Sequence, residues 1–128
     1  MPQISDKEYL NSIINVVADP IFVKDHDFRF IIANNALCSM LGLERENIIG
    51  KTLGESLPAD QMDHFLEIDR MVLESGQENI CEEKLTGAGG KILTIVTKKT
   101  RYIDGGGNKF LVGVIRDITE RSQAEQAK

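Results

Sequence analysis

The side chains best able to carry chemistry in this chain are two cysteines, two histidines and a surplus of carboxylates. Cys38 and Cys81 form no CxxC pair and lie in no group of histidines, so their spacing predicts neither a structural zinc site nor a disulfide framework. Both are expected to be packing residues, Cys38 within "NALCSML" and Cys81 within a strand. Two isolated thiols favour a reducing, cytoplasmic setting.

Signatures of catalysis are missing from the sequence. It contains no P-loop, no Rossmann glycine set, no HExxH and no nucleophile elbow. The segment "GAGGK", residues 87–91, lacks the P-loop spacing and is better explained as a hairpin turn. The 20 acidic side chains offer many accidental pairs, so no general acid and base can be singled out. We therefore expect no catalytic residue and no enzymatic activity in this chain.

Asp69 is the carboxylate whose position stands out. Helical spacing places it between Phe65 and Val72, close to the apolar side of a helix. Two interpretations stay open: the carboxylate contacts a polar ligand, or it pairs with a strand Lys or Arg at the margin of the apolar stripe, as charges near a core usually do. Asp69 is therefore a candidate ligand contact.

Composition limits the chain to one domain and few function classes. Its 128 residues, 41% of them hydrophobic, suffice for one core. The net charge of -5 disfavours nucleic-acid binding, and the basic residues Lys98, Lys99 and Arg101 are expected on a solvated sheet face. The sequence has no apolar run of the roughly 20 residues that a membrane span needs, and its start is no secretion signal.

The elements that position these residues follow from periodicity and capping. A capping box of Ser5 and Glu8 begins an amphipathic helix that extends to about residue 19, with an apolar stripe of Leu10, Ile13, Ile14 and Val17. The runs "PIFVKD" and "FRFIIAN", rich in β-branched and aromatic residues, predict a hairpin around residues 25–27. Asn34 caps a short helix that Gly42 closes.

The second half of the chain predicts one long helix and three strands. One or two helical turns are expected between residues 42 and 60, then a helix over 60–75 with Gly76 as its stop. Strands over 78–85, 91–103 and 109–118 are divided by the turns "TGAGG" and "DGGGN". This order predicts an α+β domain at residues 20–119 with flanking helices at 1–19 and 120–128.

In this order the segments resemble a PAS domain of bacterial or archaeal sensory proteins. The resemblance covers residues 8–121 and rests on "PIFVKDHDFRFIIANNA", "MLGLERENIIGKT", "RMVLESGQ" and "GVIRDITER". It implies a five-stranded antiparallel sheet of order 2-1-5-4-3, roofed on one face by helices, with space for a ligand or cofactor beneath the roof. The residues expected to line that space are Ile32, Leu37, Met40, Leu41, Leu57, Met62, Phe65, Leu66, Asp69, Ile95, Val112 and Val114.

The resemblance suggests cofactors, none of which the sequence demands. Flavin-binding members carry a reactive Cys in an "NCR" motif; the corresponding region "GESLPADQ" has none, so flavin–cysteinyl photochemistry is not expected. Haem-binding oxygen sensors use a His of the long helix, which here corresponds to His64. His64 lies among Asp60, Asp63 and Glu67, an environment typical of a solvated or capping His, so haem is an alternative and the cofactor stays unknown.

The exit segment "GVIRDITER" resembles the joint between a PAS sheet and an output helix. Thr119 is expected to cap that helix through its hydroxyl, and Asp117 and Thr119 together to form the signalling joint. The resemblance implies a ligand-binding sensory module, dimeric through its N-terminal helix and sheet and fused to a histidine kinase. The alternatives are a haem-bound gas or redox sensor, a ligand-free dimerisation spacer, and a PAS domain of a diguanylate cyclase.

Overall fold

The computed structural model describes residues 6–52 and 57–126. Its sheet has five antiparallel strands in the order β2-β1-β5-β4-β3. This confirms the predicted α+β class and strand order. Along the chain, with η marking 3-10 turns, the elements are α1 Asp6–Ile14, β1 Ile21–Lys24, β2 Phe30–Ala33, α2 Asn35–Leu41, η1 Arg45–Asn47, α3 Ala59–Ser75, β3 Asn79–Thr86, η2 Ala88–Gly90, β4 Ile92–Ile103, β5 Lys109–Asp117 and α4 Thr119–Gln126.

The first hairpin and α2 form where local side chains satisfy the backbone. In the turn between β1 and β2, Oδ1 of Asp25 accepts a hydrogen bond from the backbone N–H of Asp27 at 2.9 Å. At the start of α2, Oδ1 of Asn34 accepts from the N–H of Leu37 at 3.1 Å, and Gly42 closes the helix with a φ of 69°. The predicted hairpin and the predicted caps of this helix are confirmed.

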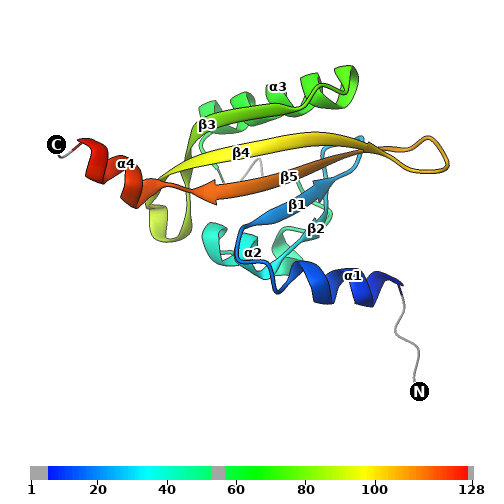
Figure 1. The fold of residues 1–128 in the computed structure, drawn as a ribbon, viewed down its shortest axis with the longest axis horizontal. Coiled ribbons are helices and arrows are strands. Elements are labelled where there is room, and N and C mark those ends of the chain that lie inside the picture. The colour runs from blue at the N-terminus through cyan, green and yellow to red at the C-terminus, as the bar shows by residue number, and fades with distance from the viewer. Residues whose placement is uncertain (1–5, 53–56, 127–128) are drawn as a thin grey trace.

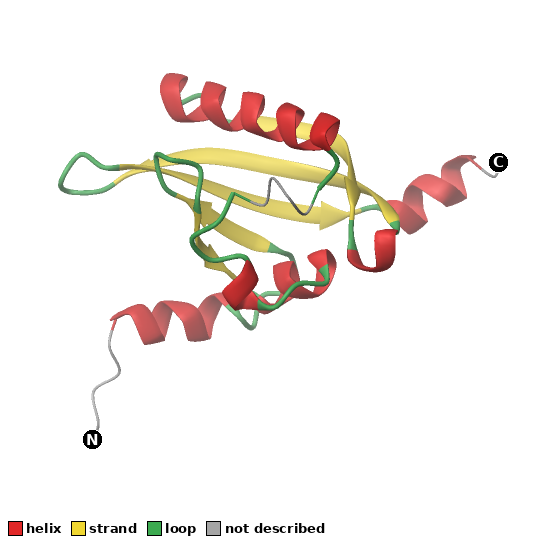
Figure 2. Ribbon diagram, turned by 180° about the vertical axis from the view of Figure 1, so that it is seen from behind, coloured by secondary structure: helices red, strands yellow, loops and turns green. Residues whose placement is uncertain are grey.

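The core lies between the sheet and the helices on one of its faces. Figure 2 shows α2, η1 and α3 together on the near face of the sheet. The prediction of a long helix is confirmed: α3 spans 17 residues and ends at Gly76. Its apolar side meets the sheet, and the largest fully buried apolar side chains come from both layers: Leu37, Ile48, Val72, Ile95 and Leu111.

α1 is shorter than predicted because a buried side chain holds the segment that follows it. Nδ2 of Asn34 donates hydrogen bonds to the carbonyl oxygens of Ile14 and Asp19, each at 3.0 Å, and Asn34 is 0% exposed. The helix therefore ends at Ile14 and the chain continues to residue 19 without helical structure. Ser5, the expected partner in the capping box, lies outside the described residues.

The apolar stripe of α1 does not pack on the sheet of its own chain. Leu10 and Ile13 are 45% and 47% exposed, Ile14 is half-buried, and Val17, which lies beyond the end of α1, is also exposed. Figure 1 shows α1 and α4 leaving the sheet at opposite ends, toward the two termini. The apolar stripe is thus exposed in the single chain.

Among the described residues, no helix is long and apolar enough to cross a membrane.

β5 turns the opposite face to the core from the one predicted. Leu111 and Ile115 are 0% and 5% exposed, whereas Val114 is 37% exposed and Val112 is half-buried. The segment "LVGVI" has apolar residues on both faces, so its period-two pattern does not select one. Gly113 lies on the inner face, where an added Cβ would overlap a phenylalanine ring. The prediction that Val112 and Val114 face the core is therefore wrong.

The basic residues of β4 do not share one solvated face. Lys98 is exposed, as predicted, but Lys99 is 3% exposed because successive strand residues alternate between faces. Arg101 is half-buried, and its Nη1 donates to the carbonyl oxygen of Leu73 at 3.2 Å, near the end of α3. The prediction of a solvated face is wrong for Lys99.

Candidate functional site

A small cavity lies between α3 and the inner face of the sheet. The space free for solvent-sized molecules is about 60 Å³, several times the roughly 10–15 Å³ that one water needs. Seven of the expected lining residues are found around it: Leu37, Met40, Leu41, Leu57, Met62, Phe65 and Ile95. The others, Ile32, Leu66, Asp69, Val112 and Val114, do not line it.

Several lining residues were not anticipated from the sequence. Phe22, Phe30, Leu85 and Ile115 complete the apolar wall, and five polar side chains also face the space: Lys24, Thr52, Glu83, Thr97 and Lys99. The two phenylalanines belong to the hairpin, with ring centroids 5.6 Å apart. Alternation through Leu111 and Gly113 to Ile115 was the available signal for β5. No comparable signal marked the lysines, since charged strand residues are usually exposed.

Asp69 forms a buried charge cluster with two lysines behind the cavity wall. Oδ2 of Asp69 accepts a hydrogen bond from Nζ of Lys24 at 2.6 Å, and Nζ of Lys99 lies 2.8 Å from Oδ1 without hydrogen-bond geometry. All three side chains are at most 5% exposed. Pairing of Asp69 with a strand lysine is thus the interpretation that the structure supports, although the pair is buried rather than marginal.

The lysines of this cluster also contact the aromatic wall. Nζ of Lys24 lies 4.7 Å from the ring centroid of Phe30, and Nζ of Lys99 lies 5.5 Å from that of Phe65. Burial lowers the pKa of the Lys24 ammonium from its ordinary 10.5; the Asp69 carboxylate opposes this shift and the Lys99 ammonium adds to it. The cavity therefore has apolar walls and cationic groups at one side.

Two polar side chains at the cavity have no hydrogen-bond partner among the described residues. They are Glu83, through both carboxylate oxygens, and Thr97, through its hydroxyl. Buried polar groups are nearly always paired, because leaving one unpaired costs about 1–3 kcal/mol. A molecule in the cavity that offers polar atoms to Glu83 and Thr97 would remove that cost.

His64 does not face the cavity, and the site does not fit haem. Its side chain is 46% exposed, and Nε2 lies 2.9 Å from Oε2 of Glu83, without hydrogen-bond geometry. A haem ligand needs an imidazole directed into an apolar space large enough for the macrocycle. The cavity of about 60 Å³ offers no such space. The expected solvated environment of His64 agrees with its exposure, and the residues around the cavity do not fit the haem alternative.

The joint between β5 and α4 is tied to β4 at Thr94. The backbone N–H of Ile118 donates to the carbonyl oxygen of Thr94 at 2.9 Å, and Oγ1 of Thr119 accepts from the N–H of Thr94 at 3.0 Å. Oδ1 of Asp117 accepts from the N–H of Thr119 at 2.9 Å and also from its hydroxyl. The start of α4 is therefore fixed to the sheet through side chains.

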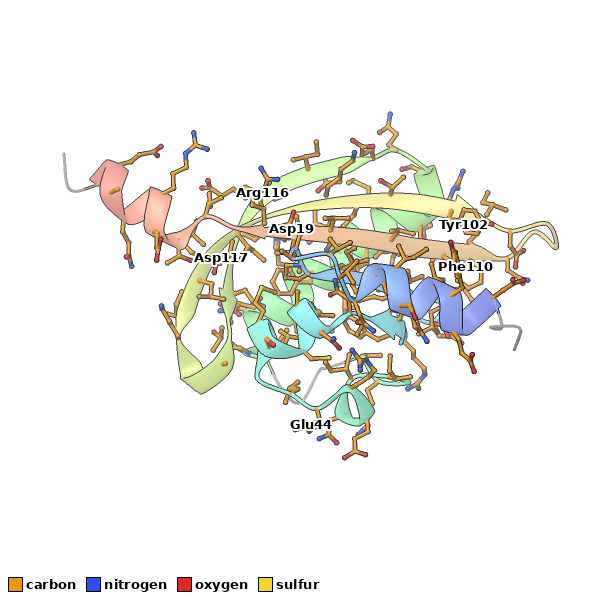
Figure 3. All side chains as sticks on the ribbon, turned by 60° about the horizontal axis from the view of Figure 1, so that its bottom comes forward. Asp19, Glu44, Tyr102, Phe110, Arg116 and Asp117 are labelled. Carbon is orange, nitrogen blue, oxygen red and sulfur yellow. The ribbon has the colours of Figure 1, made fainter. Side chains whose placement is uncertain are left out.

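The prediction that the Thr119 hydroxyl caps α4 is wrong. Thr119 is the first residue of α4, and its Oγ1 bonds Thr94 and Asp117 rather than a first-turn amide. The capping function falls instead to Asp117, whose carboxylate accepts from the N–H of Thr119. Figure 3 shows Asp117 at this joint and Arg116 beside Asp19, with 3.7 Å between Nη2 and Oδ2. The exit strand thus also contacts the segment before β1.

The fold and the cavity together define a class of protein. In this class a five-stranded antiparallel sheet of order β2-β1-β5-β4-β3 encloses a small cavity beneath helices on one face. The family described as PAS fold matches residues 8–118. The chain belongs to the PAS family.

The similar proteins include a sensor kinase, a protein solved with a bound molecule and a protein of uncharacterised function. The uncharacterised protein y4lL of Sinorhizobium fredii is 37% identical over 119 residues, which cover 91% of this chain and 14% of that protein. Sensor protein kinase WalK of Staphylococcus aureus is 30% identical over 131 residues, covering 97% of this chain and 28% of that protein. The solved structure of VqmA bound to DPO is 26% identical with a TM-score of 0.77, covering 91% of this chain and 60% of that one.

This chain corresponds to a small part of its curated relatives, between 12% and 28% of their length in the cases of y4lL, WalK and a sensor of Methanosarcina acetivorans. PAS domains are thus found in sensor proteins, including a sensor protein kinase and a two-component sensor histidine kinase.

Proposed function

We propose that this chain is a sensory PAS module that binds a small molecule in the cavity beneath α3. The observation that carries the proposal is the pair of buried, unpartnered polar groups, on Glu83 and Thr97, at an otherwise mostly apolar cavity. Such a space favours a small molecule with an apolar body and one or two polar atoms. The similarity to VqmA bound to DPO supports a small-molecule ligand.

The ligand-binding role requires no catalysis by this chain. A ligand that binds one arrangement of the sheet and α4 more tightly than another shifts the population toward it. The hydrogen bonds of Thr119 with Thr94 of β4 and with Asp117 support this joint as the route by which a change in the sheet would reach α4. The similarity to WalK favours a histidine kinase as the effector in a cytoplasmic part of the parent protein, with a diguanylate cyclase as the alternative.

Dimerisation is the second part of the proposed function. The exposed side chains of Leu10 and Ile13 in α1, and of Val17 just after it, provide apolar surface for a second copy of this chain. The outer sheet face adds Ile80, which is 64% exposed, and Val114. If the cavity binds no ligand, the same surfaces support the alternative that the domain is a ligand-free dimerisation spacer.

Mass spectrometry of small molecules released from the natively purified chain tests the ligand proposal. The matched control is Ile115→Phe, because this residue lines the cavity and a larger side chain fills it. We expect an organic molecule in amounts comparable to the protein from the wild type and none from Ile115→Phe. Equal recovery from both proteins would place the molecule elsewhere, and no recovery from either would favour the spacer.

A further inference from the structure

Three side chains with different donor atoms meet between α3 and β3. They are His64, Cys81 and Glu83, which bring one imidazole nitrogen, one thiol sulfur and one carboxylate oxygen within 4.8 Å of one another. Cys81 and Glu83 are two residues apart on β3 and therefore lie on the same face of the sheet. His64 reaches them from α3, which packs over that face. No sequence motif connects the three residues, because α3 and β3 meet only in the folded chain.

Glu83 provides independent evidence that this cluster needs a cation. Its side chain is 2% exposed, and neither carboxylate oxygen has a hydrogen-bond partner among the described residues. The two buried lysines nearby, Lys24 and Lys99, both form their ion pairs with Asp69. The ion contact printed for Glu83 is with Nε2 of His64 at 2.9 Å, which carries a positive charge only when the imidazole is protonated. With a neutral imidazole the buried carboxylate has no paired charge, which is costly, and a cation held by these groups would supply one.

We propose that His64, Cys81 and Glu83 bind a divalent transition metal of zinc type. Nitrogen, sulfur and carboxylate ligands together suit zinc, which they hold at about 2.0–2.3 Å in a tetrahedral arrangement. Ligand atoms around such an ion are about 3.3–3.8 Å apart, while the three groups here lie within 4.8 Å. The half-exposed imidazole of His64 has the freedom to close this difference by rotation. A fourth position stays open for water or another ligand.

The charges of the site balance once the metal is bound. A cysteine binds a metal as its thiolate, so a divalent ion displaces the thiol proton of Cys81 to water and leaves a thiolate, a carboxylate and a neutral imidazole around two positive charges. The sum is zero, and this limits the repulsion from Lys99.

This site goes beyond the proposed ligand function and does not depend on it. Glu83 belongs to both the cluster and the cavity wall, so the metal would lie at the edge of the cavity. The two proposals have separate readouts, because an organic molecule is detected by its release and the metal by its own spectrum. Failure of one test leaves the other standing, but both proposals use Glu83: a metal there leaves Thr97 as the polar group without a hydrogen-bond partner that an organic molecule would meet in the cavity.

Cobalt titration of the purified 128-residue chain, after removal of metals by a chelator, tests the proposal. Co²⁺ occupies zinc sites and gives a thiolate-to-cobalt charge-transfer band only when a cysteine is a ligand. We expect this band to saturate at one ion per chain and to disappear when Zn²⁺ is added. Absence of the band in the wild type overturns the proposal without recourse to any variant.

Two of the three ligands, Cys81 and His64, have a matched control within the chain, which contains two cysteines and two histidines. Cys81→Ser should abolish the band, and His64→Ala should weaken zinc binding, measured by competition with a chromogenic chelator, by at least about 10–100-fold. Cys38→Ser and His26→Ala should leave the cobalt band and the zinc affinity unchanged, because Cys38 lies on α2 and His26 in the β1–β2 turn, outside the proposed site. A band that persists in Cys81→Ser or vanishes in Cys38→Ser would overturn the assignment.

Discussion

The hydroxyl of Thr119, the first residue of α4, accepts a hydrogen bond from the backbone N–H of Thr94 in β4 at 3.0 Å. This contact spans 25 positions of the sequence, and both partners are buried. A helix that begins in this way does not move independently of the sheet. If the joint transmits a signal, breaking the Thr94–Thr119 bond is the change that would release α4 from the sheet.

Removal of the Thr119 hydroxyl should loosen α4 from the sheet. Thr119→Val keeps the shape of the side chain but leaves the N–H of Thr94 unpaired and buried, so we expect the free energy of unfolding to fall by about 1–3 kcal/mol. Urea denaturation measures the loss, and hydrogen exchange at the Thr94 amide should accelerate. Thr100→Val, in the same strand but without a side-chain hydrogen bond among the described residues, is the control.

The same joint is open to a functional test. In the full-length parent protein, Asp117→Ala and Thr119→Ala should change the response of the effector while the isolated domain stays folded, since loss of the Asp117 cap costs about 1 kcal/mol. Normal regulation in both variants would exclude the joint as the signalling route.

Removal of the Asp69 carboxylate should destabilise the chain far more than removal of its exposed neighbour. Asp69→Ala leaves Lys24 and Lys99 buried without their shared carboxylate, and loss of one partner of a buried ion pair costs about 3–5 kcal/mol. Asp63→Ala, at an exposed position of the same helix, should change the free energy of unfolding by less than about 0.5 kcal/mol. Equal values from chemical denaturation of the two variants would contradict this account of the cluster.

The elements were predictable from the sequence because their signals are local. The cap at Asn34, the stop at Gly76 and the Gly-rich turns depend on neighbouring residues, and the structure retains them all. The strand order is not local, and it came from the resemblance to PAS domains. The shorter α1 depends on hydrogen bonds from Asn34 to carbonyls 15 to 20 positions earlier, which no local pattern reveals.

The candidate site was less predictable because it depends on which face each strand buries. Because β5 has apolar residues on both faces, Val114 and Ile115 were equally plausible as core residues. In "TKKT" the alternation of a strand exposes Lys98 and buries Lys99. Burial of Lys99 is explained only by Asp69, which lies 30 residues away on α3 and meets it after folding. Charges that compensate each other across elements leave no pattern in a single segment.

The lowered pKa of Lys24 predicts a pH-dependent stability. Between that lowered value and 10.5, the unfolded chain holds the Lys24 proton and the folded chain has released it, so the wild type gains stability as pH rises through this window. Lys24→Met lacks this contribution, and the difference in free energy of unfolding, wild type minus variant, should increase from neutral pH to 10.5. Lys98→Met, at an exposed residue of β4, should show no such increase. A difference that is constant or decreases with pH would refute the shift.

Gly113 should control both the stability of the sheet and the size of the cavity. A Cβ at this position would overlap the ring of Phe22, which lines the cavity, so in Gly113→Ala the ring must move. Overpacking of this kind costs about 1–3 kcal/mol, and displacement of the ring into the cavity should reduce recovery of a bound molecule. Gly105→Ala, in the turn between β4 and β5 with open space around it, is the matched control for both measurements.

A second substitution separates the packing effect from any general loss of stability. Phe22→Leu shortens the side chain that Gly113→Ala displaces, so the double variant should be more stable than the sum of the two single losses predicts, as residues in direct contact are usually coupled by about 0.5–3 kcal/mol. Denaturation of the two single variants and the double variant gives the coupling energy. Strict additivity would mean that Gly113 is required for a reason other than the Phe22 ring, and the proposed link between β5 and the cavity would be lost.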